Sequence, residues 1–566
     1  MRYFYQNLDL ILKRLVIIFC FLQFGQTLSA QKLHLKAVGK TEIETRIIDS
    51  IGYNPDHNNA KSVVDESNAI SEKLTRIGFI ENEISEDKKT NDSTFLFHYS
   101  LGRKTNSIHI YIGKNPELKS LGIFNSENDT LIMPLSEAEN FMNQTLYKLE
   151  KKGYALSKLQ LKNIRKNREY LEAELFYTAE KKRQLNDIVI NGYAKFPEGH
   201  KANIKRIYRN QVFNQDNLKK LHDDIAKFRF VKQTKYPEIL FSKDSTKIYV
   251  YVEKTKANTF DGFIGFSNSE EKKITFNGYV DLLLNNILNT GETFTIYWKS
   301  DGNDQKTFNG GVELPYVFKS PFGLKGQLNI FKQDSTFQNT KTAIDLGYFF
   351  NYNTRLYLGY QATESSDIQN LNTSSISDYK NSFLTTNFEF FQFSPENQLF
   401  PEKTKMIVKT GVGSRESKFN KNSQFFLNVD FGHSIYLNEK NNFYIRTQDY
   451  YLSSDTYIVN EMYRFGGINS VRGFNENSLQ ANAFASILTE YRYILAPAIY
   501  VHSIIDYGYY QDKTSNTEGN LLGLGFGFGL LTKNGFFNIV YANGSNGNDP
   551  IKLSNSIVHI SFKTNF

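Results

Sequence analysis

Hydrophobic and polar residues alternate regularly along the second half of the chain. From Phe260 onward, runs with a period of two are separated by turn-forming residues at intervals of about 10–20 residues, which indicates β-strands. These runs predict sixteen strands, at 260–268, 273–284, 292–300, 306–316, 323–333, 338–351, 354–364, 379–393, 404–415, 422–437, 442–451, 482–494, 498–510, 520–532, 536–542 and 556–566. An even number of such strands is required of a single-chain bacterial membrane barrel, so the pattern predicts a transmembrane antiparallel β-barrel over 257–566.

The last strands show which face of this barrel is apolar. The final run ends on an aromatic residue and places its apolar side chains on one face: Val558, Ile560, Phe562 and Phe566. In the run 520–532, glycines alternate with leucine and phenylalanine, which leaves one face without side chains. We expect the apolar faces to contact lipid and the glycines to leave room inside the barrel.

The links between the predicted strands also alternate in length. Tight turns follow even-numbered strands, at 352–353, 496–497 and 534–535, whereas longer links such as 365–378 follow odd-numbered strands. Short turns belong on the periplasmic side of such barrels and long loops outside. The longest link, 452–481, falls between strands eleven and twelve and carries several glycines. A long loop of this kind is usually functional.

The first half of the chain contains a repeat of about 75 residues. Phe79, Tyr154 and Phe230 each follow a helix with mixed polar and apolar faces, and glycines at 78 and 153 suit helix C-caps. The third unit, 181–256, reads most clearly as β-α-α-β-β. Its predicted strands are 184–192, 236–241 and 247–252, and its helices are 200–209 and a second helix capped by Asn214.

The first two units are predicted at 31–113 and 114–180. In the first, we expect strands at 33–38, 94–101 and 107–112, with helices at 42–50 and 60–76. In the second, we expect a helix at 136–152 and strands at 158–164 and 170–178. Its first strand and first helix are poorly marked within 114–134, so this unit is predicted to be degenerate.

The N-terminal residues and the composition indicate in which compartment the protein is located. Residues 1–30 resemble a secretory signal, with basic residues before the apolar run 15–22 and a small residue before Gln31. Cys20 is the only cysteine and would be removed with that signal; acylation of Cys20 is a minor alternative, because a bulky phenylalanine precedes it. The net charge of +8 is spread along the chain, and no nucleic-acid module accompanies the lysine-rich patches, so nucleic acid is not an expected partner.

The sequence offers no candidate catalytic or metal centre. Its nine histidines are scattered, and no metal-binding, phosphate-binding or nucleophile motif is present. Glu490 and Asp506 could form an acid–base pair, but we favour a structural role for both. We therefore expect neither a cofactor nor enzymatic turnover.

The link 452–481 contains a recognisable motif. Its residues are Gly466, Gly467, Val471, Arg472, Gly473 and Phe474. Glu490-Tyr-Arg492 lies in the next predicted strand, and Asp506-Tyr-Gly508 lies in the one after. In this order, the three motifs resemble those of the BamA/TamA-like outer-membrane assembly superfamily, and the β-α-α-β-β units resemble its periplasmic POTRA domains. The turn 286–292 is also similar to the first periplasmic turn of that family.

The resemblance implies the following site. The loop would fold into the barrel, and Arg472 would pair with Asp506 and Glu490 on its inner wall. Polarity and strand parity agree for Asp506, because it shares a face with His502 and Gly508. The first strand is short and contains Gly262 and Gly265, so its seam with the last strand, near Phe562 and Phe566, should pair weakly.

The function implied is insertion of unfolded client β-barrel proteins into the outer-membrane bilayer, with POTRA sheet edges capturing the client in the periplasm. Accessory periplasmic or lipoprotein subunits are further candidate partners. The alternative is a two-partner-type channel that secretes polypeptides across the outer membrane, although such channels typically have two POTRA units and an N-terminal plug helix. A passive porin is the third class, and it would need neither POTRA units nor an inward loop.

Overall fold

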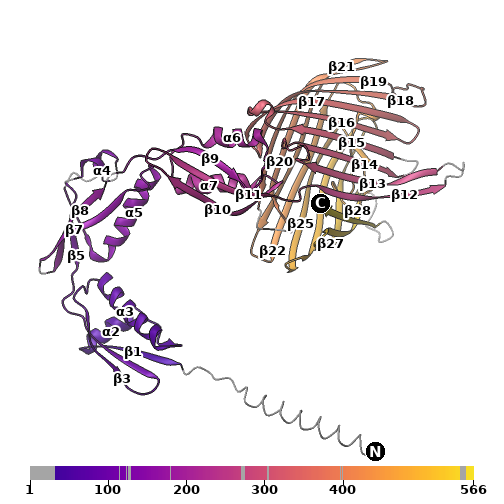
Figure 1. Cartoon of the computed structure of the whole chain (residues 1–566). Coiled ribbons are helices and arrows are strands. Elements are labelled where there is room, and N and C mark those ends of the chain that lie inside the picture. Colours follow the sequence, from indigo (N-terminus) through magenta and orange to yellow (C-terminus); the bar gives the residue numbers. More distant parts are fainter. Residues whose placement is uncertain are drawn as a thin grey trace, which may run out of the picture. The chain divides into compact units, whose positions relative to one another are not determined.

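The computed structural model of the chain describes residues 32–566, except 114, 123, 125–128, 168, 179, 269–273, 302–304, 395–396, 398 and 548–555. The expected signal segment, with Cys20, lies outside these residues. The chain forms two compact units, Met1–Lys182 and Arg183–Phe566 (Figure 1). None of the described helices has the length and apolar character needed to cross a membrane.

The first α/β domain contains four strands and two helices. Its elements are β1 (Leu33–Gly39), α2 (Glu42–Ser50), β2 (Asp56–His57), α3 (Ala60–Arg76), β3 (Glu83–Lys89) and β4 (Thr94–Ser100). The sheet order is β2-β1-β4-β3, with β1 parallel to β4. Thr41 and Glu44 form a capping box at α2, and Asn59 caps α3. Apolar side chains from both helices and the central strands form the core.

The second α/β domain repeats this topology. It consists of β5 (Ser107–Tyr111), α4 (Pro116–Ser120), β6 (Thr130–Pro134), α5 (Ala138–Lys151), β7 (Lys158–Asn167) and β8 (Tyr170–Thr178), with sheet order β6-β5-β8-β7. Strands β5 and β8 are parallel, as β1 and β4 are in the first domain. Among the described residues, the strands and α-helices of this unit follow the same order as in the first domain. The predicted departure from the repeat is therefore limited to the first helix, α4, which is shorter than α2.

One prediction for these domains is wrong, and one strand was not predicted. Ser107–Tyr111 pairs with β6 and β8, so the boundary between the domains lies before residue 107 and not at 113. Alternation shows that a strand exists but not which strand it pairs with. Strand β3, Glu83–Lys89, was not predicted because it is an exposed edge strand with Ile84 as its one apolar residue; an edge that buries nothing needs no apolar pattern.

The third α/β domain follows the predicted order. It consists of β9 (Leu185–Asn191), α6 (Glu198–Tyr208), α7 (Gln215–Ala226), β10 (Val231–Phe241) and β11 (Thr246–Lys254), and Asn214 caps α7. The sheet order is β10-β11-β9, with β9 parallel to β11. In the first domain, β2 pairs with the start of β1 at two positions. The segment 210–213 occupies the same place in the third domain: the Leu185 N–H donates to the Gln211 carbonyl and the Asn210 N–H to the Leu185 carbonyl, each at 2.8 Å, and Gln184 bridges Val212.

The predicted barrel is present, and all sixteen predicted strands are found. They are β12 (Thr259–Asn268), β13 (Ile274–Asn285), β14 (Thr293–Asp301), β15 (Gln305–Leu314), β16 (Phe322–Gln333), β17 (Phe337–Asn351), β18 (Thr354–Asp367), β19 (Tyr379–Phe393), β20 (Glu402–Ser417), β21 (Lys421–Tyr436), β22 (Asn441–Ser453), β25 (Ala483–Ala496), β26 (Ile499–Asp512), β27 (Thr517–Leu531), β28 (Gly535–Ser545) and β29 (Ile557–Asn565). They form one closed antiparallel ring in chain order.

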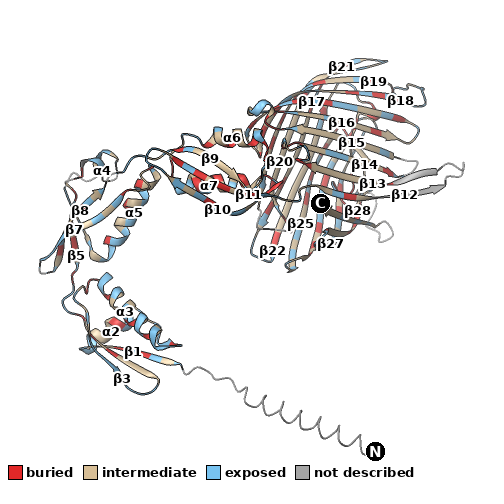
Figure 2. Ribbon diagram, in the orientation of Figure 1, coloured by how far each residue is buried: buried red, intermediate tan, exposed pale blue. Residues whose placement is uncertain are grey.

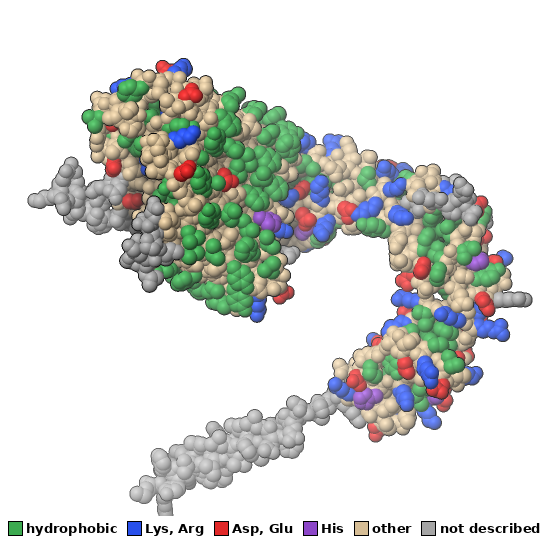
Figure 3. Space-filling view, turned by 180° about the vertical axis from the view of Figure 1, so that it is seen from behind, with side chains coloured by type: hydrophobic (Ala, Val, Ile, Leu, Met, Phe, Trp, Pro, Cys, Tyr) green, Lys and Arg blue, Asp and Glu red, His purple; other side chains and the backbone are tan. Residues whose placement is uncertain are grey.

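The faces of the barrel strands alternate as the sequence predicts. In β17, Ile344 and Leu346 are 70% and 52% exposed on the outside, whereas Asp345 between them is 2% exposed and points inward. Bands of different exposure follow one another along the barrel strands in Figure 2. Apolar side chains crowd the outer surface of the barrel, and charged side chains are more frequent on the α/β domains (Figure 3). Such a surface is stable in a bilayer, because lipid covers the apolar band and ring closure satisfies the strand edges.

The short turns of the barrel contact the third domain. Tyr193 bonds to Asn286 and Asn289 in the turn after β13, with 3.0 Å for each bond. Asn203 of α6 donates to the Ser320 carbonyl in the turn after β15, at 2.9 Å. The second and fourth strands of the barrel, β13 and β15, therefore lead into turns on the side of this domain. The alternating link lengths predict such turns for the periplasmic face.

His200 of α6 is the centre of this contact. Its ring is fully buried between Phe228 and Phe230 of its own domain and Tyr316 and Tyr352 of the barrel turns, with ring centroids 4.9–5.3 Å away. Neither ring nitrogen has a hydrogen-bond partner. Burial, with a smaller effect of the Arg355 charge, lowers the pKa of His200 to about 3. The imidazole is thus held neutral between aromatic rings.

We expect acidification to weaken this contact. The folded-state pKa of His200, about 3, lies below the usual value of ~6.5. The neutral, buried His200 therefore contributes fully to the free energy of unfolding above pH 6.5. This contribution is lost as the pH falls toward 3, and about 2 kcal/mol of it is lost by pH 5. Thermal unfolding of the full chain at pH 7.5 and pH 5 measures this effect. His200→Phe should remove most of the pH dependence; an unchanged pH dependence in that variant would contradict the assignment.

Candidate functional site: the inward loop and the barrel seam

The long link between β22 and β25 lies inside the barrel. It contains the short helix η3 (Val459–Glu461) and a two-stranded sheet of β23 (Tyr463–Phe465) and β24 (Leu479–Ala481). Val471 is fully buried in an apolar cluster with side chains of the barrel wall, including Phe484, Leu488 and Leu521. Because these wall residues point inward, the loop occupies the lumen, as the resemblance implies.

Arg472 makes the central contacts of this loop. Its Nε and Nη2 donate to the two carboxylate oxygens of Asp506 at 2.8 and 2.6 Å, and its backbone N–H donates to Asp506 at 2.9 Å. Nη1 forms an ion pair with Glu490. Asp506 is fully buried and Arg472 is 6% exposed. This two-point geometry is the strong form of an arginine–carboxylate contact.

The carboxylate of Glu490 is shared between two arginines. Besides Arg472, it binds Arg492 of the same strand through Nε at 2.7 Å. His502 lies 3.8 Å away. Since Glu490 and Asp506 are both engaged by arginine, their surroundings favour fixed carboxylates over an acid–base pair, which needs a proton to move between states. The structure brings together Arg472, Asp506 and Glu490.

Two glycines allow the loop backbone to approach the wall. Gly473 adopts φ +91°, and a Cβ there would lie 2.3 Å from the backbone of Asn543 and Gly544 in β28. On the wall, a Cβ at Gly523 of β27 would lie 2.4 Å from the Arg472 carbonyl. The glycine face of β27 therefore accommodates the loop. Gly466 and Gly467, with φ +102° and +97°, turn the chain after β23, and Phe474 packs beside Gly544.

Two further anchors of the loop were not predicted. Glu461 forms an ion pair with Arg415 of β20, and both side chains are at most 2% exposed. Glu476 binds Lys299 of β14 at 2.6 Å and accepts from Tyr297 at 2.8 Å. The partners are separated by 46 and 177 residues, so spacing gives no signal. Strand alternation could have predicted that the side chains of Arg415 and Lys299 point into the barrel. It could not have predicted which loop carboxylate each of them binds.

The seam between the first and last barrel strands has little pairing. Among the described residues, β12 pairs with β29 at two positions, Thr259↔Asn565 and Phe260↔Thr564, whereas the other neighbouring barrel strands pair at eight or more positions. The ladder between these strands ends at Phe260, and Gly262, two residues further along β12, has a φ of +155°. There the Phe562 N–H meets the Asp261 side chain at 3.3 Å and not a strand carbonyl.

The predicted seam residues occupy this region. Gly262 and Gly265 both lie in β12. Phe562 and Phe566 are 41% and 50% exposed, on the side of the strand that holds Val558 and Ile560. The seam is therefore a closed but weakly paired edge with an apolar outer surface.

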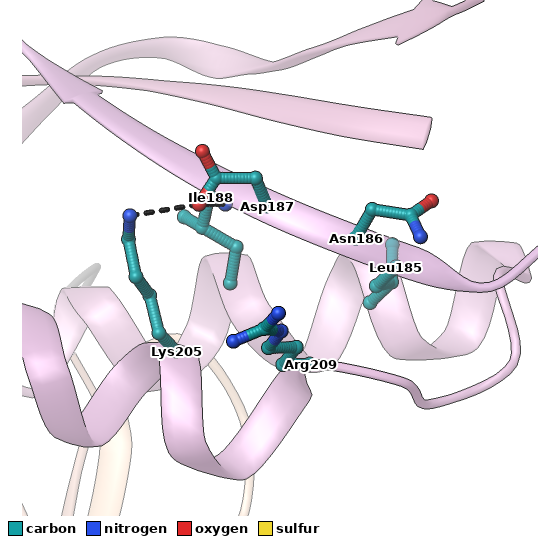
Figure 4. A pocket seen from close by; sticks show the side chains of 6 residues that line it. All are labelled: Leu185, Asn186, Asp187, Ile188, Lys205 and Arg209. Atoms are coloured by element: carbon teal, nitrogen blue, oxygen red, sulfur yellow. Dashed lines mark hydrogen bonds and ion pairs between the residues drawn. The ribbon is translucent and has the colours of Figure 1, made fainter. Parts of the chain in front are cut away.

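A small cavity lies next to β9 of the third domain. It has a volume of about 230 Å³ and is lined by Leu185, Asn186, Asp187, Ile188, Lys205 and Arg209. Lys205 of α6 binds Asp187 of β9 at 2.7 Å, and Arg209 lies at the end of the same helix beneath the strand (Figure 4).

The architecture defines the class of protein. Three POTRA-like α/β domains precede a closed antiparallel barrel of sixteen strands, and a loop that carries an arginine folds into its lumen. The chain has the fold of the BamA/TamA-like outer-membrane superfamily, as its motifs predict.

The folds of two solved CdiB structures agree with this fold. CdiB from Acinetobacter baumannii matches with a TM-score of 0.52 and 14% identity, over 80% of this chain and 87% of that chain. CdiB from Escherichia coli matches with a TM-score of 0.50 and 14% identity, over 92% and 98%. BamA from Haemophilus ducreyi lacking POTRA domains 1–3 aligns over 80% and 97%, with 14% identity and a TM-score of 0.46. No protein-family profile and no curated protein matches the chain.

Proposed function

We propose that this chain is an outer-membrane assembly factor of a Gram-negative bacterium, which captures unfolded client β-barrel proteins in the periplasm and inserts them into the bilayer without enzymatic turnover. Its N-terminal segment would act as the export signal, and accessory periplasmic or lipoprotein subunits would assist it. The observation that carries this proposal is the seam between β12 and β29, with its two paired positions.

A weakly paired seam suits insertion for a physical reason. Few ladder hydrogen bonds must break before β12 and β29 separate, and each separated strand then offers a free edge to a client strand. A short seam also favours local thinning of the bilayer, which lowers the cost of inserting a new strand. Capture would begin at exposed sheet edges of the α/β domains, such as the edge strand β3, where a client segment could add as a further strand.

A second candidate is secretion of polypeptides through the barrel. It is favoured by a cavity of about 610 Å³ in the lumen beside the inward loop. Insertion leaves the client in the membrane, whereas secretion delivers it across, so the location of a client in vesicles distinguishes the two functions.

A cross-link across the seam tests insertion. Phe260→Cys and Thr564→Cys occupy paired positions on the outer face, within reach of a disulfide. Oxidation should abolish folding of a small outer-membrane barrel protein into vesicles that contain the purified chain, and a reductant should restore it. Client folding is measured by heat-modifiable migration.

The matched control places the same cross-link elsewhere in the wall. Leu314→Cys and Leu324→Cys are paired outward residues of β15 and β16, and their oxidation should leave client folding unchanged. Full activity of the oxidised seam variant would refute insertion through this seam.

A further inference from the structure

The turn after β19 places a phenylalanine against the inner wall of the barrel. Phe400 is 6% exposed, and the centres of its ring and the Tyr500 ring are 4.7 Å apart in an edge-to-face contact. Tyr500 lies on the same face of β26 as His502 and Asp506, so it points into the lumen. Leu399 and apolar side chains of β25, β27 and β28 complete the cluster around Phe400. Phe400 therefore lies inside the barrel, on the wall that carries Asp506.

This turn also contacts the third domain. Arg229, between α7 and β10, lies over the Phe393 ring at the end of β19, with 4.4 Å from the guanidinium carbon to the ring centre. Seven residues further along the chain, the Phe400 carbonyl accepts from the hydroxyl of Tyr436 in β21 at 3.1 Å. The turn therefore connects the third domain with the lumenal side of the barrel wall.

Arg492 of β25 lies against two aromatic rings. Its guanidinium carbon is 4.6 Å from the centre of the Phe400 ring and 4.2 Å from that of Tyr444 in β22. Both distances suit a cation–π contact, which is stronger where water is excluded. Rings stacked on the planar guanidinium leave its N–H groups to bind in the plane, and Nε donates to Glu490 at 2.7 Å. The rings thus help to fix the direction in which Arg492 meets Glu490.

A continuous row of contacts joins the turn to the inward loop. Phe400 contacts Arg492, Arg492 binds Glu490, and Glu490 binds Arg472. The side chains around Phe400 and Arg492 come from β21, β22, β25 and β26, which are consecutive in the ring. Chains of packed side chains and ion pairs can carry energetic coupling between two sites. Because Asp506 also binds Arg472, loss of this row should loosen the loop and not release it.

We propose that Phe400 is a positioning residue for the Arg472 site, and that the turn after β19 sets how firmly the inward loop is held. While Phe400 lies on Arg492, Glu490 stays where it meets Arg472. Withdrawal of Phe400 from the wall frees Arg492 to change rotamer, and Glu490 then follows it away from Arg472. A displacement of this turn from the side of the third domain would thus reach the loop. The inference concerns the loop and goes beyond the proposed insertion of clients.

The reactivity of a thiol in the loop tests this coupling. Ser470→Cys combined with Cys20→Ser gives a chain with one cysteine, two residues before Arg472, at a position that is 7% exposed. The purified full chain in detergent is treated with a maleimide, whose rate of addition reports how often the loop leaves the wall. Phe400→Ala should raise this rate about threefold or more, as expected for the loss of a cation–π contact.

Further variants separate positioning from space filling. Phe400→Leu keeps an apolar side chain without a ring, so it should raise the rate as Phe400→Ala does. Phe400→Tyr keeps the ring and should keep labelling slow. Arg492→Gln should itself raise the rate. Phe400→Ala should add nothing further in that chain, because its effect acts through Arg492.

Phe349→Ala is the matched control. Phe349 of β17 is fully buried and lies over a different arginine, Arg355, at 5.1 Å. Its loss should destabilise the barrel but leave the labelling rate of Ser470→Cys unchanged. Heat-modifiable migration of each variant verifies that its barrel is folded.

Slow labelling in Phe400→Ala or Phe400→Leu, or fast labelling in Phe400→Tyr, would overturn the inference. So would an undiminished effect of Phe400→Ala in the Arg492→Gln chain. An equal rise in Phe349→Ala would overturn it as well, because the loop would then respond to any loosening of the barrel. No client is present in these measurements, so a failure of client insertion by the unaltered chain would refute the proposed function alone.

Discussion

Arg472→Ala is expected to release the loop from the β25–β26 wall and to cause the largest loss of stability among single substitutions in the barrel. The change leaves Asp506, which is fully buried, without its cation, and Glu490 keeps only Arg492. Breaking a buried ion pair from one side costs ~3–5 kcal/mol, because an unpaired charge remains in a dry site. Heat-modifiable migration over a temperature series measures stability, and protease cleavage between residues 454 and 482 measures loop release.

Arg46→Ala provides the matched control for this substitution. Arg46 forms an exposed ion pair with Glu42 on α2, with both side chains more than three-quarters accessible, and such pairs contribute ~0–1 kcal/mol. Exchanging the charges, Arg472→Asp with Asp506→Arg, should restore part of the loss. Wild-type protease resistance and client folding in Arg472→Ala would show that the loop is held by its other anchors alone.

Removal of all three α/β domains should leave a folded barrel that no longer assembles clients. The chain 256–566 retains every barrel strand, and lipid and ring closure, not the domains, satisfy its apolar faces and strand edges. The sheet edges of these domains, which we propose to capture clients, would be absent. Heat-modifiable migration should remain, while folding of a client barrel in vesicles should fall to the level of empty vesicles.

A shorter deletion separates the contributions of the domains. Removal of 31–182 leaves the compact unit of the third domain and barrel, with the His200 contact intact, and should retain part of the client folding. Full client folding by 256–566 would contradict the role given to the domains, whereas loss of the barrel itself would contradict the independence of its fold.

Barrel strands were predictable because the membrane imposes a strict rule on them. Each strand separates lipid from lumen, so residues such as Ile344 and Asp345 must alternate, and this alternation gave strand bounds close to those observed. The β-α-α-β-β order of the third domain was predictable from helix periodicity and the Asn214 cap. The assignment of Ser107–Tyr111 to the first domain was wrong, because alternation contains no information about the pairing partner.

The candidate site was predictable only in part. Arg472, Asp506 and Glu490 could be named because their motifs resemble those of a known superfamily. Glu461–Arg415 and Glu476–Lys299 join residues far apart in the chain, and their pairing depends on how the loop folds in the lumen. His200 also carried no signal, since a histidine on a helix gives no indication that aromatic turns of another domain will surround it.

The anchors of the loop have a mechanical consequence for the ring. Arg472 and Glu476 are four residues apart, and they attach to β26 and β14, which lie on opposite sides of the seam in the strand order. The loop segment between them therefore links the two sides of the seam between β12 and β29, which has the fewest paired positions in the barrel. In the opening proposed for insertion, this loop segment would limit how far β12 and β29 separate, so the gap would have a maximum width. The same restraint would favour the return of the two strands to their register.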